Sequence, residues 1–314
     1  MKNKLLAVMA TLGMVASASA VKVNNNLSIN GFIDGSYQLT EQTAGKTQEL
    51  GVDEVEINFV VSAGAVSGLV ALDTDIPGGV AAEDNIDIEQ AHFTYDLGNG
   101  VAVTFGRYGS ALGFEREDPA GLYTFSRAYG TGAASDFNFG DVDGGPVDGI
   151  TVSYTAESFS LAASFEEDAA RNLDQDDLDL ELSFTYTGIA GVTLGGGYFY
   201  HNEADPAEEE DKLNIHASKQ VGKLLLAGEY SQIEAAGLDR DAYLLLADYD
   251  VNDKLGVALR FSNAEIAANS DYESFTIAPN YAITDNLGAI IEYSDIEEGA
   301  NDSEVYAVEL TYTF

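Results

Sequence analysis

The chain has 314 residues, of which 53 are acidic and 14 are basic, and its formal charge is −39. Such an excess of negative charge excludes nucleic acid as a partner and favours cations, although adaptation to a saline habitat would produce the same excess. The absence of cysteine excludes disulfides, thiolate metal sites and a cysteine nucleophile.

The first twenty residues have the features of a secretory signal peptide. Two lysines precede an apolar stretch from Leu5 to Val15, and Ala18-Ser19-Ala20 matches the cleavage pattern. The apolar stretch is shorter than the roughly 20 residues that a membrane helix needs. We therefore expect an exported protein with a cleaved signal over residues 1–20 and one domain over residues 21–314. Loss of the two lysines takes the formal charge from −39 to −41.

Beyond the signal, apolar and polar residues alternate with a period of two. In the segment 178–186 every second residue is apolar and the residues between are polar. This pattern is typical of a half-buried β-strand and excludes an amphipathic helix. The phase slips between Ile88 and Ala91, which predicts a β-bulge. In chain order the pattern predicts sixteen strands, at 27–39, 52–62, 65–73, 86–97, 101–108, 148–156, 158–166, 177–187, 191–201, 211–220, 223–232, 241–251, 254–264, 271–282, 286–295 and 303–314.

The connections between these strands alternate between short and long. Short turns occur, for example, at 63–64 and 98–100, and the connection 109–147 is by far the longest. An even number of strands with short turns at one rim and long loops at the other is how bacterial outer-membrane barrels are built. We therefore expect an all-β fold, a transmembrane antiparallel up-and-down barrel with both termini at the periplasmic rim. The other long connections are 74–85, 167–176, 202–210, 233–240, 265–270 and 296–302.

Two motifs carry a family resemblance. The chain ends on Val308-Glu309-Leu310-Thr311-Tyr312-Thr313-Phe314, and Gly106-Arg107-Tyr108-Gly109 leads to Gly113-Phe114-Glu115. The terminal motif is similar to the last strand of Gram-negative porins of the sixteen-stranded, general-diffusion type, and the internal motif resembles their fifth strand entering the third loop. The resemblance implies an outer-membrane channel, embedded in lipid, for passive diffusion of ions and small hydrophilic solutes, with no catalytic residue and no cofactor. It also implies a homotrimer, recognition of Tyr312 and Phe314 by the barrel-assembly machinery, and an inward-folded loop 109–147.

Charged residues on the polar phase of the strands are candidates for the pore lining. The first four predicted strands contain no Arg or Lys, which departs from trimeric porins, where arginines of the early strands face acids on the third loop. Asp34, Glu54, Glu56 and Asp87 occupy the lumen phase instead, and rings of carboxylates select cations. We therefore expect a cation-selective pore. Its candidate lumen and constriction residues are Glu54, Glu56, Asp87, Arg107, Glu115, Arg116, Glu117, Asp118, Arg127 and Arg260.

Two other functions are compatible with an outer-membrane barrel. His216-Ala217-Ser218 resembles the His–Ser pair of outer-membrane phospholipase, which faces lipid. Here the row of Leu213, Ile215 and Ala217 is predicted to face lipid, so the pair falls on the lumen side. A non-channel adhesin or structural barrel is the other alternative. The strand count favours a channel, because sixteen strands leave an aqueous lumen whereas eight to ten are filled by side chains.

A calcium ion on the acidic loops is a further expectation. Asp141-Val142-Asp143-Gly144 resembles the start of a calcium loop, but the glutamate that ends the full pattern is missing. Weak calcium binding at Asp141 and Asp143 is therefore expected rather than a dedicated site.

Overall fold

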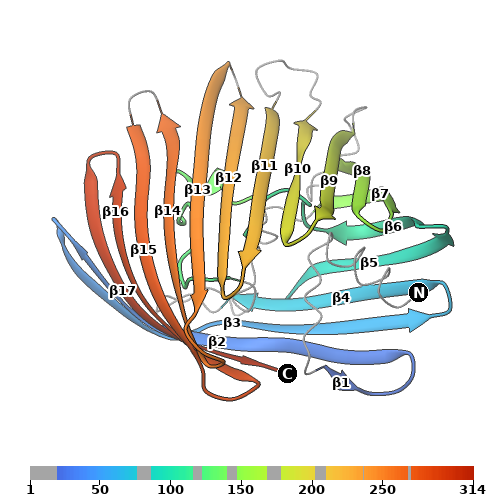
Figure 1. Cartoon of the computed structure of the whole chain (residues 1–314), viewed down its shortest axis with the longest axis horizontal. Helices are drawn as coiled ribbons and strands as arrows, with labels where there is room; N and C mark the ends of the chain where they lie inside the picture. Colours follow the sequence, from blue (N-terminus) through green and yellow to red (C-terminus); the bar gives the residue numbers. More distant parts are fainter. Residues whose placement is uncertain are drawn as a thin grey trace.

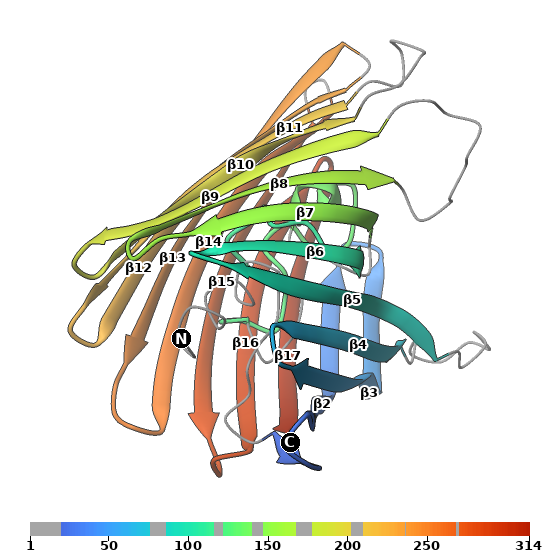
Figure 2. The ribbon, with the colours of Figure 1, turned by 90° about the vertical axis from the view of Figure 1, so that its right-hand side faces the viewer.

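The computed structural model describes residues 20–75, 86–115, 122–139, 147–167, 178–201, 210–235, 237–267 and 270–314. Within them, seventeen strands form one antiparallel sheet, which curves round into a barrel (Figures 1 and 2). Among these residues no helix is long and apolar enough to cross a membrane. The strands are β1 (Val21–Lys22), β2 (Leu27–Gln42), β3 (Gly45–Ala63), β4 (Val66–Asp75), β5 (Asp87–Gly98), β6 (Val101–Tyr108), β7 (Val147–Thr155), β8 (Phe159–Glu167), β9 (Asp179–Ile189), β10 (Val192–His201), β11 (Glu210–Val221), β12 (Leu224–Ala235), β13 (Leu238–Asp250), β14 (Leu255–Ala267), β15 (Ser270–Ala282), β16 (Leu287–Glu298) and β17 (Asn301–Thr313).

The alternating apolar and polar residues of each strand lie on the outer and inner faces of the barrel wall, respectively. On β9, Leu182, Phe184 and Tyr186 are exposed on the outside, whereas Asp179 and Glu181 are buried on the inside. Other strands repeat this arrangement, so the outer face carries a broad apolar surface. A surface of that extent on a closed β-sheet is suited to lipid rather than water.

The barrel closes by pairing its last long strand with its first. β17 pairs with β2 from Thr313↔Phe32 to Ser303↔Gln42. Phe314 continues the ladder, since its N–H donates to the Gly31 carbonyl at 3.0 Å and its carbonyl accepts from the Gly31 N–H at 3.1 Å. β2 to β17 thus form a closed ring of sixteen strands, and β1 adds a short pairing with β2. Closure leaves no unpaired strand edge, which lipid would not tolerate.

The sixteen predicted strands and the predicted bulge are confirmed. Ala71 pairs with Gln90 and Leu72 pairs with Ile88, so Glu89 is the extra residue on β5. The prediction of long loops at 233–240, 265–270 and 296–302 was wrong, because strands occupy most of these segments. Beyond the apolar band both faces of a hairpin meet water. Strands can therefore continue there without alternation, held by their backbone hydrogen bonds.

The prediction that the first four strands lack basic residues was wrong at one position. β3 begins at Gly45 and not near residue 52, so it includes Lys46. The Lys46 side chain is 61% exposed and forms an ion pair with Glu41 on β2. Both residues lie beside the β2–β3 hairpin, at the end of the strands away from the chain termini. The inner face of β2 to β5 therefore still lacks Lys and Arg among the described positions.

Candidate functional site

The described parts of the connection between β6 and β7 lie inside the barrel. We call residues 109–146 the lumen loop; its described parts are 109–115 and 122–139, and they contain the short 3-10 helix η2 (Ser135–Phe137). Ser110 Oγ donates to Glu181 Oε2 at 2.5 Å, and the Gly113 N–H donates to Asn214 Oδ1 at 3.2 Å. Both acceptors lie on the inner face of the wall, so the expectation of an inward-folded loop is confirmed. The lumen loop is drawn in green inside the barrel in Figure 2.

A glycine on β10 gives the lumen loop room to pass close to the wall. A Cβ atom at Gly197 would lie 2.7 Å from Leu112 Cδ2 and 2.1 Å from the Leu182 carbonyl oxygen. Both distances are below van der Waals contact, so a larger residue would push the loop away. This close approach explains the glycine at a position inside a strand.

Arg260 on β14 fixes the centre of the lumen loop. Its side chain is 1% exposed, and its Nη1 lies 3.1 Å from Glu115 Oε2. Nη1 also donates to Thr124 Oγ1 at 2.6 Å, and Nη2 donates to the Arg127 carbonyl at 2.9 Å. One buried guanidinium thus joins both described parts of the loop to the wall. A buried charge is tolerated because a carboxylate and several oxygen acceptors surround it.

Wall carboxylates hold the loop backbone as well. The Phe114 N–H donates to Glu229, the Ser126 N–H donates to Glu292 Oε2 at 3.1 Å, and the Ala133 N–H donates to Glu298 Oε1 at 2.8 Å. Tyr129 Oη donates to Glu229 Oε1 at 3.4 Å, and burial raises the pKa of the Tyr129 phenol so that it remains a donor. Part of the acidity of the lumen therefore positions the loop, because a carboxylate is a strong acceptor for backbone N–H groups.

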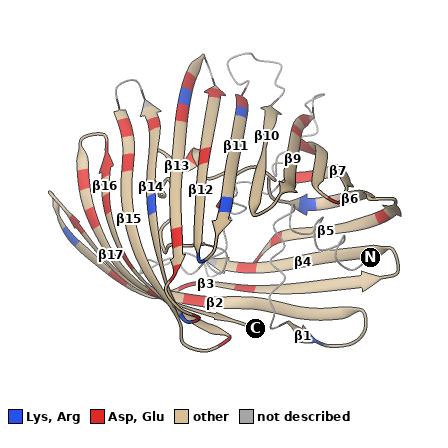
Figure 3. Ribbon diagram, viewed as in Figure 1, with Lys and Arg blue, Asp and Glu red and all other residues tan. Residues whose placement is uncertain are grey.

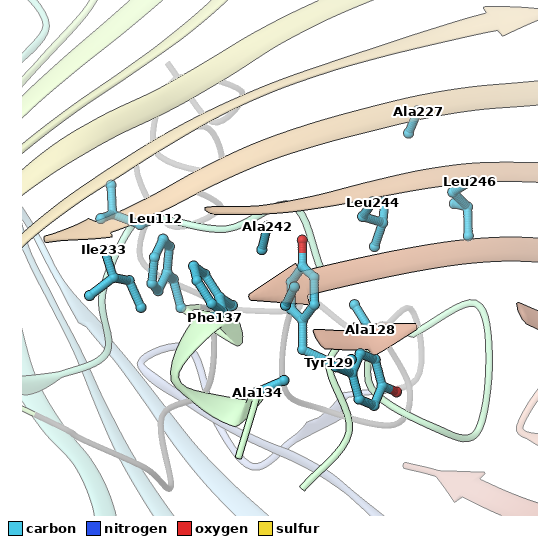
Figure 4. Close-up of a cluster of buried hydrophobic side chains, with 13 residues drawn as sticks. Leu112, Ala128, Tyr129, Ala134, Phe137, Ala227, Ile233, Ala242, Leu244 and Leu246 are labelled. Carbon is cyan, nitrogen blue, oxygen red and sulfur yellow. The ribbon is translucent and has the colours of Figure 1, made fainter. Parts of the chain in front are cut away.

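An apolar cluster packs the second described part of the lumen loop, 122–139, against the wall. Phe137 and Tyr129 are each 1% exposed and point toward Ala242 and Leu244 of β13 (Figure 4). The run from Ala242 to Ala247 is apolar on both strand phases, so β13 presents apolar side chains to the lumen as well as to the outside. The sequence predictions did not use this signal. It marks the wall segment that the loop covers.

The opposite part of the wall carries a row of directly opposed carboxylates. Asp34 on β2 pairs in register with Glu54 on β3, Glu56 pairs with Asp73 on β4, and Asp73 pairs with Asp87 on β5. Figure 3 shows the red bands on β2, β3 and β4. We call these five residues the acidic wall. The acidic wall therefore concentrates carboxylates on one part of the lumen wall.

The remaining predicted site residues are placed as follows. Arg107 Nη2 lies 3.4 Å from Asp148 Oδ2 on the neighbouring strand β7, and Arg127 is half-buried in the lumen loop. Arg116, Glu117 and Asp118 lie outside the described residues, and so do Asp141 and Asp143 with the calcium prediction. Among the described residues, no group of three or more His, Asp or Glu side chains is placed to hold a metal ion. A role for these residues at the narrowest point of the pore stays a prediction.

His216 lies on the lumen side of β11. Its ring centroid is 5.8 Å from that of Phe114 in the lumen loop. Ile215, the residue before it, is exposed on the outer face. The lipid-facing arrangement of the phospholipase pair is therefore not the one that His216 adopts here.

Comparison with known proteins identifies the family. The model of the Gram-negative porin family matches residues 5–302. The chain belongs to this family. None of the curated proteins compared matches the chain. The family and the fold together place this porin in the outer membrane, where it forms a channel.

Solved structures share the fold of this porin at low sequence identity. OmpF of Salmonella typhi, in complex with daunomycin, superposes with a TM-score of 0.71 at 13% identity, covering 94% of this chain and 100% of its own. An anion-selective porin from Comamonas acidovorans has a TM-score of 0.65 at 14% identity, with 92% and 99% covered. OmpT of Vibrio cholerae, in a trimer form, has a TM-score of 0.61 at 12% identity, with 92% and 100% covered. At identities this low, the similarity establishes the fold alone. The ion selectivity of this porin has to be judged from its own lumen residues.

Proposed function

We propose that this porin is a water-filled channel for passive diffusion of ions and small hydrophilic solutes, and that it prefers cations. The acidic wall is the observation that carries the proposal. It places five carboxylates on four adjacent strands, where Asp34 opposes Glu54 and, in a second group, Glu56 opposes Asp73 and Asp73 opposes Asp87. The described inner face of those strands carries no Lys or Arg. Carboxylates gathered on the wall of a pore attract permeating cations.

The basic residues of the lumen support the same preference. Arg260 is buried beneath the lumen loop and paired with Glu115, and Arg240 Nη2 lies 2.8 Å from Asp136 Oδ2. Lys212 Nζ lies 2.7 Å from Glu210 Oε1. Each of these three cations is paired with a carboxylate outside the acidic wall. A porin of the same fold from Comamonas acidovorans is anion-selective, which is consistent with lumen charge rather than fold setting the preference.

The reversal potential of the purified protein in a planar bilayer tests the proposal directly. Under a potassium chloride gradient, a cation-preferring pore gives a reversal potential with the sign of the potassium equilibrium potential. A reversal potential of the opposite sign would refute it.

We propose in addition that the porin is a homotrimer. OmpT of Vibrio cholerae, which shares the fold, occurs in a trimer form. The outer face of this barrel is apolar all round, so part of it can be covered by neighbouring copies instead of lipid. Native mass spectrometry of the detergent-extracted protein is expected to give three times the mature chain mass. A mass of one chain at all protein concentrations would contradict the trimer.

Deletion of Phe314 is expected to impair assembly rather than conduction. Phe314 supplies the last pair of hydrogen bonds between the closing strands, and its ring stacks on Tyr312 with centroids 6.2 Å apart. The deletion should reduce the amount of heat-modifiable barrel in the outer membrane severalfold. Asn301, at the other end of β17, offers a matched control for shortening the same strand. Normal yield of the Phe314 deletion would contradict an assembly role.

Signal cleavage is expected after Ala20. The intact mass of the outer-membrane protein should correspond to a chain that begins at Val21. Because β1 already pairs Val21 with Ile29, the mature chain would begin directly at the wall of the barrel. A mature protein that retains Met1 would overturn both the export prediction and the mature charge of −41 derived from the sequence.

A further inference from the structure

A cavity of about 490 Å³ lies between the lumen loop and the wall strands β8 to β11. Its floor is a row of directly opposed residues, since Glu181 pairs in register with Phe199 and Phe199 pairs with Lys212. Phe139 of the lumen loop lines the cavity from the side opposite the wall. The acidic wall lies on other strands, β2 to β5, so none of its five residues lines this cavity.

The cavity has an excess of negative charge. Lys212 is paired with Glu210, and Glu181 accepts hydrogen bonds from Ser110 and from the Ala111 N–H at 2.9 Å. Glu166 is 2% exposed, and its Oε1 atom has no hydrogen-bond partner among the described residues. A buried carboxylate oxygen without a donor is unfavourable, and a ligand that brings an N–H donor with positive charge would relieve this.

The rings of Phe139 and Phe199 provide a surface for the apolar part of an organic ligand. Lys212 Nζ is 5.2 Å from the ring centroid of Phe199 and 6.0 Å from that of Phe139. The rings therefore already flank an ammonium group, in the range in which a cation is attracted to an aromatic face. Leu112 adds apolar surface to the same cavity. The combination of ring faces and a buried carboxylate fits a ligand with an apolar body and a positive end.

We propose that this cavity binds small organic ammonium ions, with the ammonium group donating to Glu166 and the apolar body against Phe139 and Phe199. The proposal rests on the channel function only in that the solute must reach the lumen. It goes beyond a general preference for cations, because it requires a saturable site that distinguishes an organic amine from a neutral molecule of the same shape.

Equilibrium binding of benzylammonium to the folded porin in detergent tests the proposal, with benzyl alcohol and benzoate as probes of the same shape but different charge. Calorimetric titration is expected to show saturable binding of benzylammonium and at least about tenfold weaker binding of the other two. Glu166→Gln should weaken benzylammonium binding about tenfold, since it removes a charge-assisted hydrogen bond. Glu167→Gln, the neighbour on β8 that does not line the cavity, is the matched control and should leave binding unchanged.

A further variant covers the case in which Glu166→Gln does not give a heat-modifiable barrel. Phe199→Leu keeps an apolar side chain but removes the ring, and it should weaken binding severalfold. Equal affinity for benzylammonium and benzyl alcohol would overturn the proposal, as would an equal loss in Glu166→Gln and Glu167→Gln. The reversal potential is measured separately. A pore without cation preference that still binds benzylammonium through Glu166 would refute the proposed selectivity and support this site.

Discussion

Replacement of Arg260 by methionine is expected to release the lumen loop from β14 and to raise the single-channel conductance. Arg260 holds both described parts of the loop, through Glu115 on one side and Thr124, Ser126 and Arg127 on the other. Breaking a buried ion pair by removing one partner costs about 3–5 kcal/mol, because the other charge is left uncompensated. The loop can avoid this cost by moving Glu115 into water, which widens the lumen.

Planar-bilayer recordings of Arg260→Met check this result, together with the mobility of the unheated protein on a gel. The barrel itself should remain closed, because the β17–β2 pairing does not involve the loop. Lys219→Met, on the exposed part of β11, removes a basic residue that forms no hydrogen bond or ion pair with the described parts of the lumen loop, 109–115 and 122–139, and it serves as the control. The double variant Arg260→Met with Glu115→Gln should be less destabilised than the sum of the single variants, since the two residues interact. A folded Arg260→Met barrel with wild-type conductance would show that the ion pair does not hold the loop.

Neutralisation of Glu54 and Glu56 is expected to lower the cation-to-anion permeability ratio substantially. Both residues belong to the acidic wall, where Glu54 is opposite Asp34 on β2 and Glu56 is opposite Asp73 on β4. The double variant Glu54→Gln with Glu56→Gln keeps the side-chain shape and removes two of the five charges. The effect depends on the salt concentration, because dissolved ions screen the carboxylates. The Debye length is about 8 Å at 0.15 M salt and about 3 Å at 1 M. The difference from wild type should therefore be large in dilute salt and small near 1 M.

Glu49→Gln is the matched control for charge, since Glu49 is an exposed residue of the same strand β3, outside the acidic wall. If acidity reflects habitat alone, the control and the double variant should change the reversal potential equally little. An unchanged reversal potential in the double variant would show that the acidic wall does not set selectivity. A wild-type pore that prefers anions would contradict the proposal at once.

The architecture was predictable from the sequence because a membrane barrel imposes one rule on each strand. Every second residue faces lipid, so the phase of the alternation locates the strands and even the bulge at Glu89. The length of the connection after Tyr108, with the porin resemblance, likewise predicted the inward loop. Strand ends were less predictable, since Lys46 and Arg240 lie where the hairpins leave the apolar band and the alternation no longer applies.

The contacts of the candidate site were not predictable in the same way. Nothing in the neighbourhood of Arg260 in the sequence indicates Glu115 as its partner, 145 positions away. Nor does the sequence around Glu229 show that this carboxylate binds the loop backbone at Phe114 rather than facing water. Such pairings depend on where the lumen loop crosses the wall. The apolar run on β13 was the one local sign of that crossing, and it was readable only as an exception to the alternation.

The anchors of the lumen loop impose an order on the maturation of the channel. The loop follows β6, but its partners Asn214, Glu229, Arg260 and Glu292 are 101 to 166 positions later in the chain. Contacts this distant in sequence form late, because the intervening chain must first be arranged. The full set of anchors exists only when β16 has joined the sheet. A barrel stalled before that stage would hold an unsecured loop, so narrowing of the lumen is coupled to completion of the wall.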